Sequence, residues 1–258
     1  MGNEIMTKSY FLNKTVVITG STRGIGLGIA QHFYNLGANV VINGTNPQNF
    51  KKISNNFDTN RSVFIQSDVT SSTGAMLLVQ KTIDYFGKID ILICNVGSGS
   101  SVALGSETYD EWQRVFNLNF FSTTNMIEAA KDYLIDFKSK VLCISSICGI
   151  DYIKGAPATY SVAKSALNSY VKMISKFYGP KGVVINAIAL GNIDFPDSVW
   201  QRKLNENPSE VSKTIANEVA LQRLGNLNDV VSWVEWLTSP FSSFSNGATY
   251  VVDGGQIV

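Results

Sequence analysis

The sequence predicts an α/β protein in which a doubly wound parallel sheet of about seven strands carries helices on both faces. Short β-branched runs alternate along the chain with longer amphipathic stretches, an order that produces parallel strands joined by helices. The short runs are apolar throughout, which is typical of strands covered on both faces. The 258 residues, 45% of them hydrophobic, suffice for one large core, so we expect a single domain over residues 1–258.

Each element is predicted by its length, periodicity and end signals. The expected strands are short and apolar, and they occupy residues 15–19, 39–42, 63–65, 89–94, 140–145, 183–189 and 249–252. The expected helices have longer amphipathic patterns, and they span about residues 24–36, 71–86, 109–137, 158–178 and 228–238. Residues 190–218 show the least regular pattern and contain Pro196 and Pro208, so we expect a substrate-covering lid there.

Composition and charge exclude several classes of function. The net charge of +1 gives no electrostatic footprint for nucleic acid or a membrane surface. No apolar run reaches the roughly 20 residues of a spanning helix, and residues 1–10 lack the apolar core of a signal peptide. The three cysteines are not spaced for a metal, and His32, the only histidine, leaves no His-rich metal site. We expect a cytoplasmic protein without a metal ion.

The first expected strand runs directly into a glycine-rich turn that opens a helix. Gly20 permits a tight turn, while Gly24 and Gly26 let the backbone approach a pyrophosphate. The helix N-terminus offers free N–H groups and the positive end of a dipole. An ordinary tight βα turn is the alternative reading. The pattern predicts a Rossmann-type dinucleotide site formed by residues of this turn: Gly20, Ser21, Thr22, Arg23, Gly24, Ile25 and Gly26.

The end of the second strand bears on which nicotinamide is bound. NAD-preferring proteins of this type place an acid there, on the ribose 2′-hydroxyl. Residues 42–46 contain no carboxylate, Arg23 could supply a cation to a 2′-phosphate, and Thr45 could add a hydrogen bond. The sequence favours NADP and leaves NAD possible. Arg23 as a solvated surface charge is the competing interpretation.

Tyr160 and Lys164 could carry acid–base chemistry. They stand four residues apart in an expected helix and therefore share a face. A nearby ammonium lowers the pKa of a phenol, and a shift of about three units corresponds to about 4 kcal/mol. Such a tyrosine can exchange a proton with a carbonyl or alcohol oxygen. Many helices contain a tyrosine and a lysine at this spacing by chance, so the pair alone does not show that the two residues are catalytic. Ser145 and Ser146 stand at the end of the fifth strand, and a hydroxyl that bonds to the backbone is the ordinary interpretation of either residue.

These motifs, in this order, resemble the short-chain dehydrogenase/reductase family, in its compact single-domain branch that includes 3-oxoacyl-acyl-carrier-protein reductases. The turn has the family's form T-G-x-x-x-G-x-G, and the resemblance covers about residues 14–255. It implies four catalytic residues: Ser146, Tyr160, Lys164 and Asn119. In the family the asparagine binds a water that links the lysine to solvent. Ser145 and Asn117 are the local competitors for two of these roles.

The resemblance also implies further contacts to the cofactor. Asp68 would bind the adenine amino group and Val69 would pack on its ring, although Asp68 could instead cap the next helix. Asn95 would tie adjacent strand ends, and Gly97 would keep the wall beside the cofactor low. Ile193 would meet the nicotinamide amide through its backbone, and Tyr160 and Lys164 would also contact the cofactor.

The sequence departs from the family pattern at three places. Val96 replaces an alanine after the fourth strand, and Leu190 and Phe195 replace the proline and threonine of the motif after the sixth. These changes put one hydrogen bond to the cofactor in doubt, and Phe195 could line the substrate pocket instead.

We expect an enzyme that acts on a small-molecule ketone or secondary alcohol. A 3-oxoacyl-thioester reductase is one candidate, and a dehydrogenase of a sugar or another polyhydroxy metabolite is the alternative, suggested by the polar residues 98–101. A non-catalytic NADP-binding sensor is a further reading, but relatives of that kind tend to lose the tyrosine or the lysine. The family also implies a homo-oligomer, a tetramer or a dimer.

Overall fold

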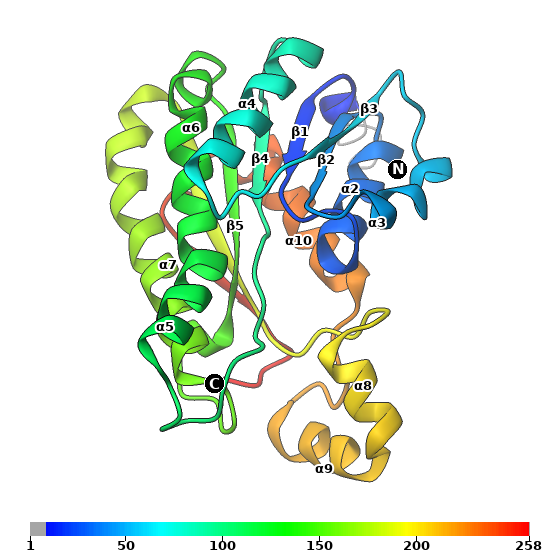
Figure 1. Ribbon diagram of the computed structural model, residues 1–258, viewed down its shortest axis with the longest axis vertical. Helices are drawn as coiled ribbons and strands as arrows, with labels where there is room; N and C mark the ends of the chain where they lie inside the picture. Colours follow the sequence, from blue (N-terminus) through cyan, green and yellow to red (C-terminus); the bar gives the residue numbers. More distant parts are fainter. Residues whose placement is uncertain (1–8, 258) are drawn as a thin grey trace.

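The computed structural model describes residues 9–257. Seven parallel strands form one sheet in the order β3-β2-β1-β4-β5-β6-β7. Figure 1 labels β1 to β5 of this sheet. The strands are β1 Thr15–Ile18, β2 Asn39–Gly44, β3 Ser62–Gln66, β4 Ile91–Cys94, β5 Lys140–Ser146, β6 Val184–Leu190 and β7 Thr249–Val252. This arrangement confirms the doubly wound parallel sheet predicted from the sequence.

Helices join the strands, and several of them begin at a side chain that caps them. The helices are α2 Gly24–Asn35, α3 Pro47–Lys51, α4 Ser72–Phe86, α5 Tyr109–Phe116, α6 Ser122–Asp136, α7 Ala158–Tyr178, α8 Val199–Glu206, α9 Pro208–Glu218 and α10 Leu227–Thr238. A π turn, Asn117–Phe121, joins α5 to α6, so the long helix expected there is interrupted. The side chains of Ser71, Thr108 and Asn226 accept backbone N–H groups at the starts of α4, α5 and α10.

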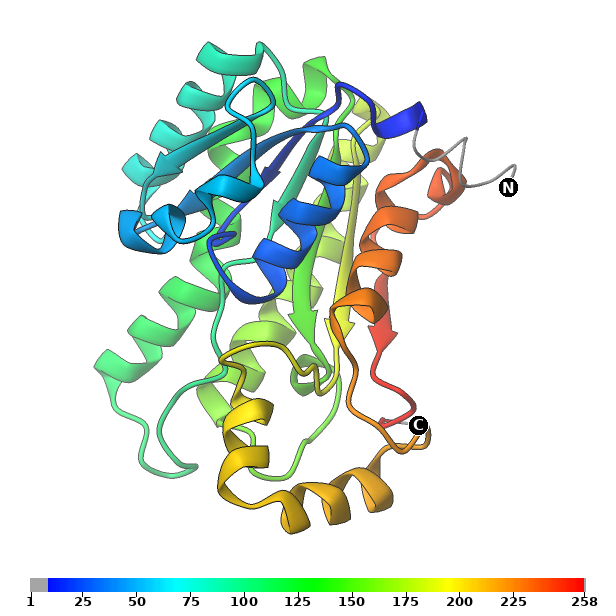
Figure 2. The ribbon, with the colours of Figure 1, turned by 90° about the vertical axis from the view of Figure 1, so that its right-hand side faces the viewer.

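Two layers of helices cover the two faces of the sheet (Figures 1 and 2). α4, α6 and α7 pack on one face, while α2 and α10 pack on the other. Successive residues of β1 point to opposite faces, so Val17 lies in one core cluster and Ile18 in the other. Both side chains are fully buried, and such burial stabilises the fold by about 1.5–3 kcal/mol for each side chain.

The order in which the chain adds strands reverses between β1 and β4, because β2 and β3 lie on one side of β1 and β4 to β7 lie on the other. Ile18 pairs with Ile93, so the segments that follow these strands start side by side at the carboxyl edge. Ligands of doubly wound sheets bind in the crevice at this switch point. Helices α8 and α9 lie beyond the same edge in both views (Figures 1 and 2). The fold therefore gathers the loops after β1, β4, β5 and β6 around one crevice.

The segment 190–218 is more regular than the sequence suggested. Two helices occupy most of it, because Ser198 caps α8, Asn207 caps α9 and Pro208 fills the first turn of α9. The short helix α3 was not predicted, although Asn46 and Pro47 form the same start signal. No helix among residues 9–257 is long and apolar enough to cross a membrane. The expectation about a signal peptide falls mainly on residues 1–8, outside the described part of the chain.

Candidate functional site

The glycine turn after β1 has a backbone that requires glycine. Gly20 and Gly24 have φ values of +63° and +58°, in the left-handed region that disfavours other residues. A Cβ on Gly26 would lie 2.5 Å from both the Gly20 carbonyl oxygen and Asn95 Nδ2. Gly20 and Gly24 thus serve the conformation of the turn, and Gly26 allows the close packing of helix α2 on the turn; the approach of a pyrophosphate to Gly24 and Gly26 stays a prediction.

Asn43, at the end of β2, fixes the same turn from the other side. Its Oδ1 accepts the Gly20 N–H at 3.1 Å and its carbonyl accepts the Ser21 N–H at 2.8 Å. Ser21 Oγ donates to the Ile18 carbonyl at 2.7 Å and accepts the Asn43 N–H at 3.0 Å. Asn43 is 1% exposed. This role of Asn43 was not predicted from the sequence; the signal was an amide directly after the apolar run Val40–Ile42.

Asn95 joins the ends of β4 and β1. Its Nδ2 donates to the carbonyls of Thr19 and Gly20 at 2.9 and 3.2 Å, and its backbone N–H donates to Thr19 Oγ1 at 2.9 Å. Gly97 follows, where a Cβ would lie 2.8 Å from Asn119 Oδ1 and 3.1 Å from Lys164 Nζ. The structure therefore places Asn95 and Gly97 between the glycine turn and the expected catalytic residues.

The N-terminus of α2 offers a place for a phosphate group. Arg23 occupies the capping position in an extended conformation, and its side chain does not cap the helix. Arg23 is exposed at this helix start, and Thr45, directly after β2, is also exposed. A Cβ on Gly44 would lie 2.9 Å from the Thr22 side chain, so the turn packs closely against the end of β2. The uncapped N–H groups, the tight glycine cradle and the nearby cation together fit a dinucleotide phosphate.

Asp68 and Val69 follow β3 at the same edge. The exposed Asp68 accepts the N–H and the hydroxyl of Thr70 at 3.0 and 2.7 Å. Ser71, not Asp68, caps α4, so the alternative role of Asp68 as a helix cap is wrong. Val69 is 2% exposed and packs in the core on the α4 face. The side chain of Asp68 thus faces solvent beside the crevice, whereas that of Val69 is almost entirely covered.

Ile193 and Phe195 lie after β6. Ile193 forms a parallel bridge with Gly225 and its side chain is buried in the core on the α2 face. The ring of Phe195 lies against the glycine turn, since a Cβ on Gly24 would be 3.0 Å from the ring. The aromatic residue that replaces the family's threonine therefore borders the phosphate turn.

Tyr160, Lys164 and Ser146 come together where α7 passes the end of β5. The Ser146 hydroxyl accepts the Cys148 N–H at 3.2 Å, and it lies close enough to the Tyr160 phenol to lower the pKa of that phenol. Lys164 Nζ lies 5.9 Å from the centre of the Tyr160 ring and donates to the Ile144 carbonyl at 2.8 Å. The structure thus places the three side chains in one cluster at the carboxyl edge.

The pKa values of this cluster are set by burial. Burial raises the pKa of Tyr160 to about 12, and the nearby Ser146 hydroxyl opposes this shift only in part. Burial lowers the pKa of Lys164, which is 3% exposed, to about 8. From the sequence we expect the lysine to lower the pKa of the phenol, and this expectation is not met. In the structure burial dominates, and the ammonium is directed at the Ile144 carbonyl.

Asn119 lies in the π turn and contacts the loop after β4. Its Nδ2 donates to the carbonyls of Val115 and Ser98, both at 3.1 Å, and its Oδ1 accepts the Ser98 N–H at 2.9 Å. Its competitor Asn117 is exposed. Ser145, the competitor of Ser146, is buried and its hydroxyl has no hydrogen-bond partner among the described residues. The geometry therefore favours Asn119 and Ser146 over their neighbours.

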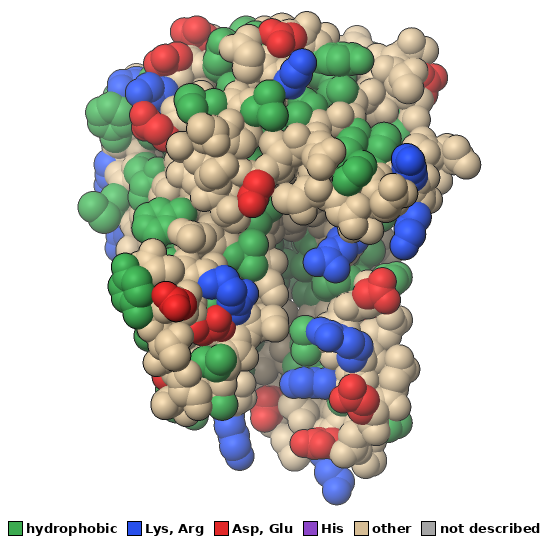
Figure 3. Space-filling model, in the orientation of Figure 1, with side chains coloured by type: hydrophobic (Ala, Val, Ile, Leu, Met, Phe, Trp, Pro, Cys, Tyr) green, Lys and Arg blue, Asp and Glu red, His purple; other side chains and the backbone are tan. Residues whose placement is uncertain are grey.

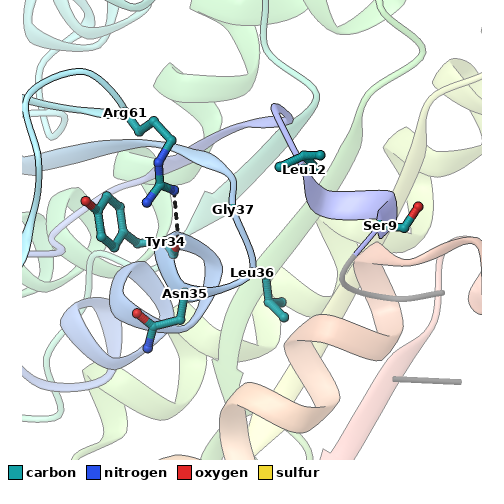
Figure 4. A pocket seen from close by; sticks show the side chains of 7 residues that line it. All are labelled: Ser9, Leu12, Tyr34, Asn35, Leu36, Gly37 and Arg61. Carbon is teal, nitrogen blue, oxygen red and sulfur yellow. Dashed lines mark hydrogen bonds between the residues drawn. The ribbon is translucent and has the colours of Figure 1, made fainter. Parts of the chain in front are cut away.

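A surface pocket of about 560 Å³ lies away from this cluster, at the far end of α2 (Figure 4). α2 separates it from the glycine turn by about 18 Å, at 1.5 Å for each of its 12 residues. Its Arg61 guanidinium donates to the carbonyls of Tyr34 and Ala38 and stacks on the Tyr34 ring. Arg61 thus satisfies carbonyl groups at and after the C-terminal end of α2. The residues that line the pocket contain no acid–base pair suited to catalysis.

The face with the carboxyl edge is hollowed between the side of α5 and the side of α8 and α9, and Lys and Arg side chains border the hollow (Figure 3). No cluster of three or more His, Cys, Asp or Glu residues that could hold a metal occurs in the described part of the chain. The residues gathered at this edge are therefore suited to a dinucleotide and to proton transfer.

Comparison with known proteins agrees with this geometry. A family model described as enoyl-(acyl carrier protein) reductase matches residues 20–256. The 3-oxoacyl-[acyl-carrier-protein] reductase of Chlamydia trachomatis is 32% identical over 251 residues, which cover 95% of this chain and 98% of the relative. Glucose 1-dehydrogenase 2 of Bacillus subtilis is 29% identical over 249 residues, 94% of each chain. The solved RhlG/NADP active-site complex of Pseudomonas aeruginosa has a TM-score of 0.86 at 26% identity, covering 96% of this chain and 99% of that one.

Proposed function

Because the chain belongs to the short-chain dehydrogenase/reductase family and is an oxidoreductase of that family, we propose that it uses NADP to reduce a ketone or to oxidise the matching secondary alcohol. The observation that carries this proposal is the Ser146–Tyr160–Lys164 cluster beside the glycine turn. When bound, the nicotinamide supplies or accepts the hydride. The chain's own residues supply orientation and the proton.

In the proposed reduction, Ser146 and Tyr160 hold the carbonyl oxygen by hydrogen bonds, and Tyr160 Oη gives it a proton as the carbon receives hydride. The raised pKa of about 12 keeps Tyr160 protonated at neutral pH, which suits its role as the acid. The Lys164 ammonium, held at the Ile144 carbonyl, stabilises the phenolate that remains. Asn119 holds the loop after β4 in place, and a water bound there would link Lys164 to solvent.

The preference for NADP rests on the electrostatics of the phosphate turn. Arg23 is exposed at the start of α2, and the end of β2 carries no carboxylate that would repel a 2′-phosphate. The solved complex of the Pseudomonas protein with NADP supports the same choice. NAD is the alternative, and a direct comparison of the two nucleotides decides between them.

Two substrate classes are candidates. A 3-oxoacyl thioester agrees with the named activity of the Chlamydia relative, and a sugar or other polyhydroxy compound agrees with that of the Bacillus relative. The polar residues 98–101 favour the second class, since they border the expected catalytic residues. A non-catalytic sensor is disfavoured, because both Tyr160 and Lys164 are present.

We further propose a single-domain cytoplasmic protein that self-associates, with residues 190–218 as a lid over the substrate. Trp233, Trp236 and Tyr250 form an aromatic cluster on α10 and β7, with ring centres 5.9–6.2 Å apart. The two tryptophans are 37% and 40% exposed, an unusual exposure for such large apolar rings. This cluster supports an interface with a second copy of the chain.

The test follows nicotinamide absorbance with a panel of acyl-thioester, sugar and simple ketones, with NADPH and NADH in parallel. The Tyr160→Phe variant runs beside the wild type, and nucleotide binding is measured separately for both. We expect turnover with NADPH that collapses in the variant while binding survives. A preference for NADH would contradict the role given to Arg23, and binding of neither nucleotide would refute the proposal as a whole.

A further inference from the structure

The loop that follows β4 is tied by side chains at three of its four positions. We call residues 98–101 the serine loop. Ser98 is held by Asn119, and the Ser100 carbonyl accepts Arg114 Nη2 at 2.9 Å. Ser101 Oγ lies 2.6 Å from Glu111 Oε1. A loop of small polar residues is ordinarily mobile, so three separate anchors indicate that its position matters.

The remaining residue of the serine loop, Gly99, faces the catalytic phenol. A Cβ on Gly99 would lie 3.7 Å from Tyr160 Cε1 and 3.8 Å from Cζ, which is van der Waals contact. The Gly99 backbone therefore forms a wall beside the part of the ring that carries the hydroxyl. A displacement of the serine loop would change the space in which Tyr160 and a substrate meet.

A second connection runs from the serine loop into the helix that carries Tyr160. Ser101 Oγ also lies 2.6 Å from Oγ1 of Thr159, the residue directly before Tyr160. Thr159 is fully buried in the first turn of α7, whose capping residue Pro157 offers no side-chain cap. The bond between Ser101 and Thr159 thus joins the loop to the start of α7.

Glu111 decides the direction of these hydrogen bonds. Arg114 donates to both of its carboxylate oxygens, at 2.7 Å each, and this guanidinium together with the Ser101 hydroxyl lowers the pKa of Glu111 to about 2. An ionised carboxylate only accepts, so the single Ser101 proton goes to Glu111. Thr159 must then donate to Ser101. The hydroxyls of Thr159 and Ser101 form an ordered chain that ends on a fixed charge.

We propose that Glu111 is a positioning residue, which acts through Ser101 and Thr159 to hold the serine loop and the start of α7 in register around Tyr160. No contact joins Glu111 to the reacting atoms; its effect passes through the hydroxyl chain. Glu111 is not needed to start α5, because Thr108 caps that helix through the Glu111 backbone N–H. The inference rests on the proposed function, in which Tyr160 is the acid.

The test compares Glu111→Gln, Ser101→Ala and their double variant with Glu128→Gln. The control also removes a carboxylate paired with a basic residue three positions away, Lys131, but on the exposed surface of α6. We expect Glu111→Gln to lower kcat about tenfold or more, as the loss of a charged hydrogen bond would. We expect a change of less than about twofold in NADPH binding, and a double variant no worse than Glu111→Gln alone, since both act through one chain.

A second readout does not need turnover. In protein labelled with 13C at tyrosine Cζ, the Tyr160 signal is assigned by its loss in Tyr160→Phe. We expect this signal to shift in Glu111→Gln and Ser101→Ala but not in Glu128→Gln. An unshifted signal would overturn the inference even if no ketone in the panel reacted, an outcome that by itself contradicts only the proposed function. Unchanged kcat in Glu111→Gln, or additive losses in the double variant, would also overturn it.

Discussion

Lys164→Met should make the nucleotide-free protein more stable at pH 7 while it removes activity. Burial lowers the pKa of Lys164 from 10.5 to about 8, and each unit corresponds to about 1.36 kcal/mol, so keeping the charge costs roughly 3 kcal/mol. The variant also loses the hydrogen bond that the Lys164 ammonium donates to the Ile144 carbonyl, worth about 2 kcal/mol because the donor is charged. The expected net gain in the free energy of unfolding is about 1 kcal/mol.

The pH dependence of this gain follows from proton linkage. Between about pH 8 and pH 10.5 the unfolded wild-type chain holds a proton on Lys164 that the folded chain has released, so wild-type stability rises with pH. Methionine does not titrate, so it adds no such rise with pH. In urea denaturation, the stability advantage of the variant over the wild type should therefore be smaller at pH 9.5 than at pH 7. A variant that is less stable than the wild type at both pH values, by the same amount, would refute this reasoning.

Lys140→Met provides the matched control. Burial also lowers the pKa of Lys140 to about 8, and its ammonium donates to the Ser239 carbonyl at the opposite edge of the sheet. The stability of this variant relative to the wild type should also fall between pH 7 and pH 9.5, whereas its turnover should remain. Lost turnover in both variants would mean that buried charge in general, and not Lys164 at the site, supports activity.

The remaining predictions concern the cofactor side. Gly26→Ala should destabilise the protein by about 1–3 kcal/mol in urea denaturation, because its Cβ meets backbone at 2.5 Å, whereas Gly28→Ala meets only a flexible leucine at 3.2 Å and should be nearly neutral. Asn95→Ala should cost about 1–3 kcal/mol in the same assay, because two strand-end carbonyls lose their donor; an unchanged midpoint would contradict that. Arg23→Ala should weaken NADPH binding by about 2 kcal/mol, roughly thirtyfold, and leave NADH binding unchanged in fluorescence titrations; equal effects on both would argue against a 2′-phosphate contact.

The sequence predicted the sheet well because its strands carry a strong, one-dimensional signal. Uniformly apolar runs such as Val40–Ile42 are typical of strands buried on both faces, and their alternation with amphipathic helices indicates a parallel sheet between two helix layers. The glycine turn was also predictable from the sequence. The positive φ at Gly20 and the close contact of Gly26 with the Gly20 carbonyl oxygen each require glycine. In both cases the order of residues along the chain was enough for the prediction, without knowledge of contacts between distant segments.

Features that depend on contacts between distant segments were less predictable. The direction of the Tyr160 pKa shift depends on the depth of burial and on where Lys164 points, and neither follows from the spacing of four residues. The role of Glu111 depends on the meeting of Ser101, α5 and Thr159. The helices within residues 190–218 were obscured by their prolines, although Pro208 in fact begins one of them.

The central claim is that hydride passes between the nicotinamide and a carbonyl carbon while Tyr160 supplies the proton. The most direct measurement supplies NADPH deuterated at both C4 positions, with whichever ketone of the panel is consumed, to the wild type and to Tyr160→Phe. The account predicts one deuterium on the carbinol carbon of the wild-type product, and no product from a variant that still binds NADPH. NADPH consumption without deuterium on that carbon, or full activity of Tyr160→Phe, would contradict it.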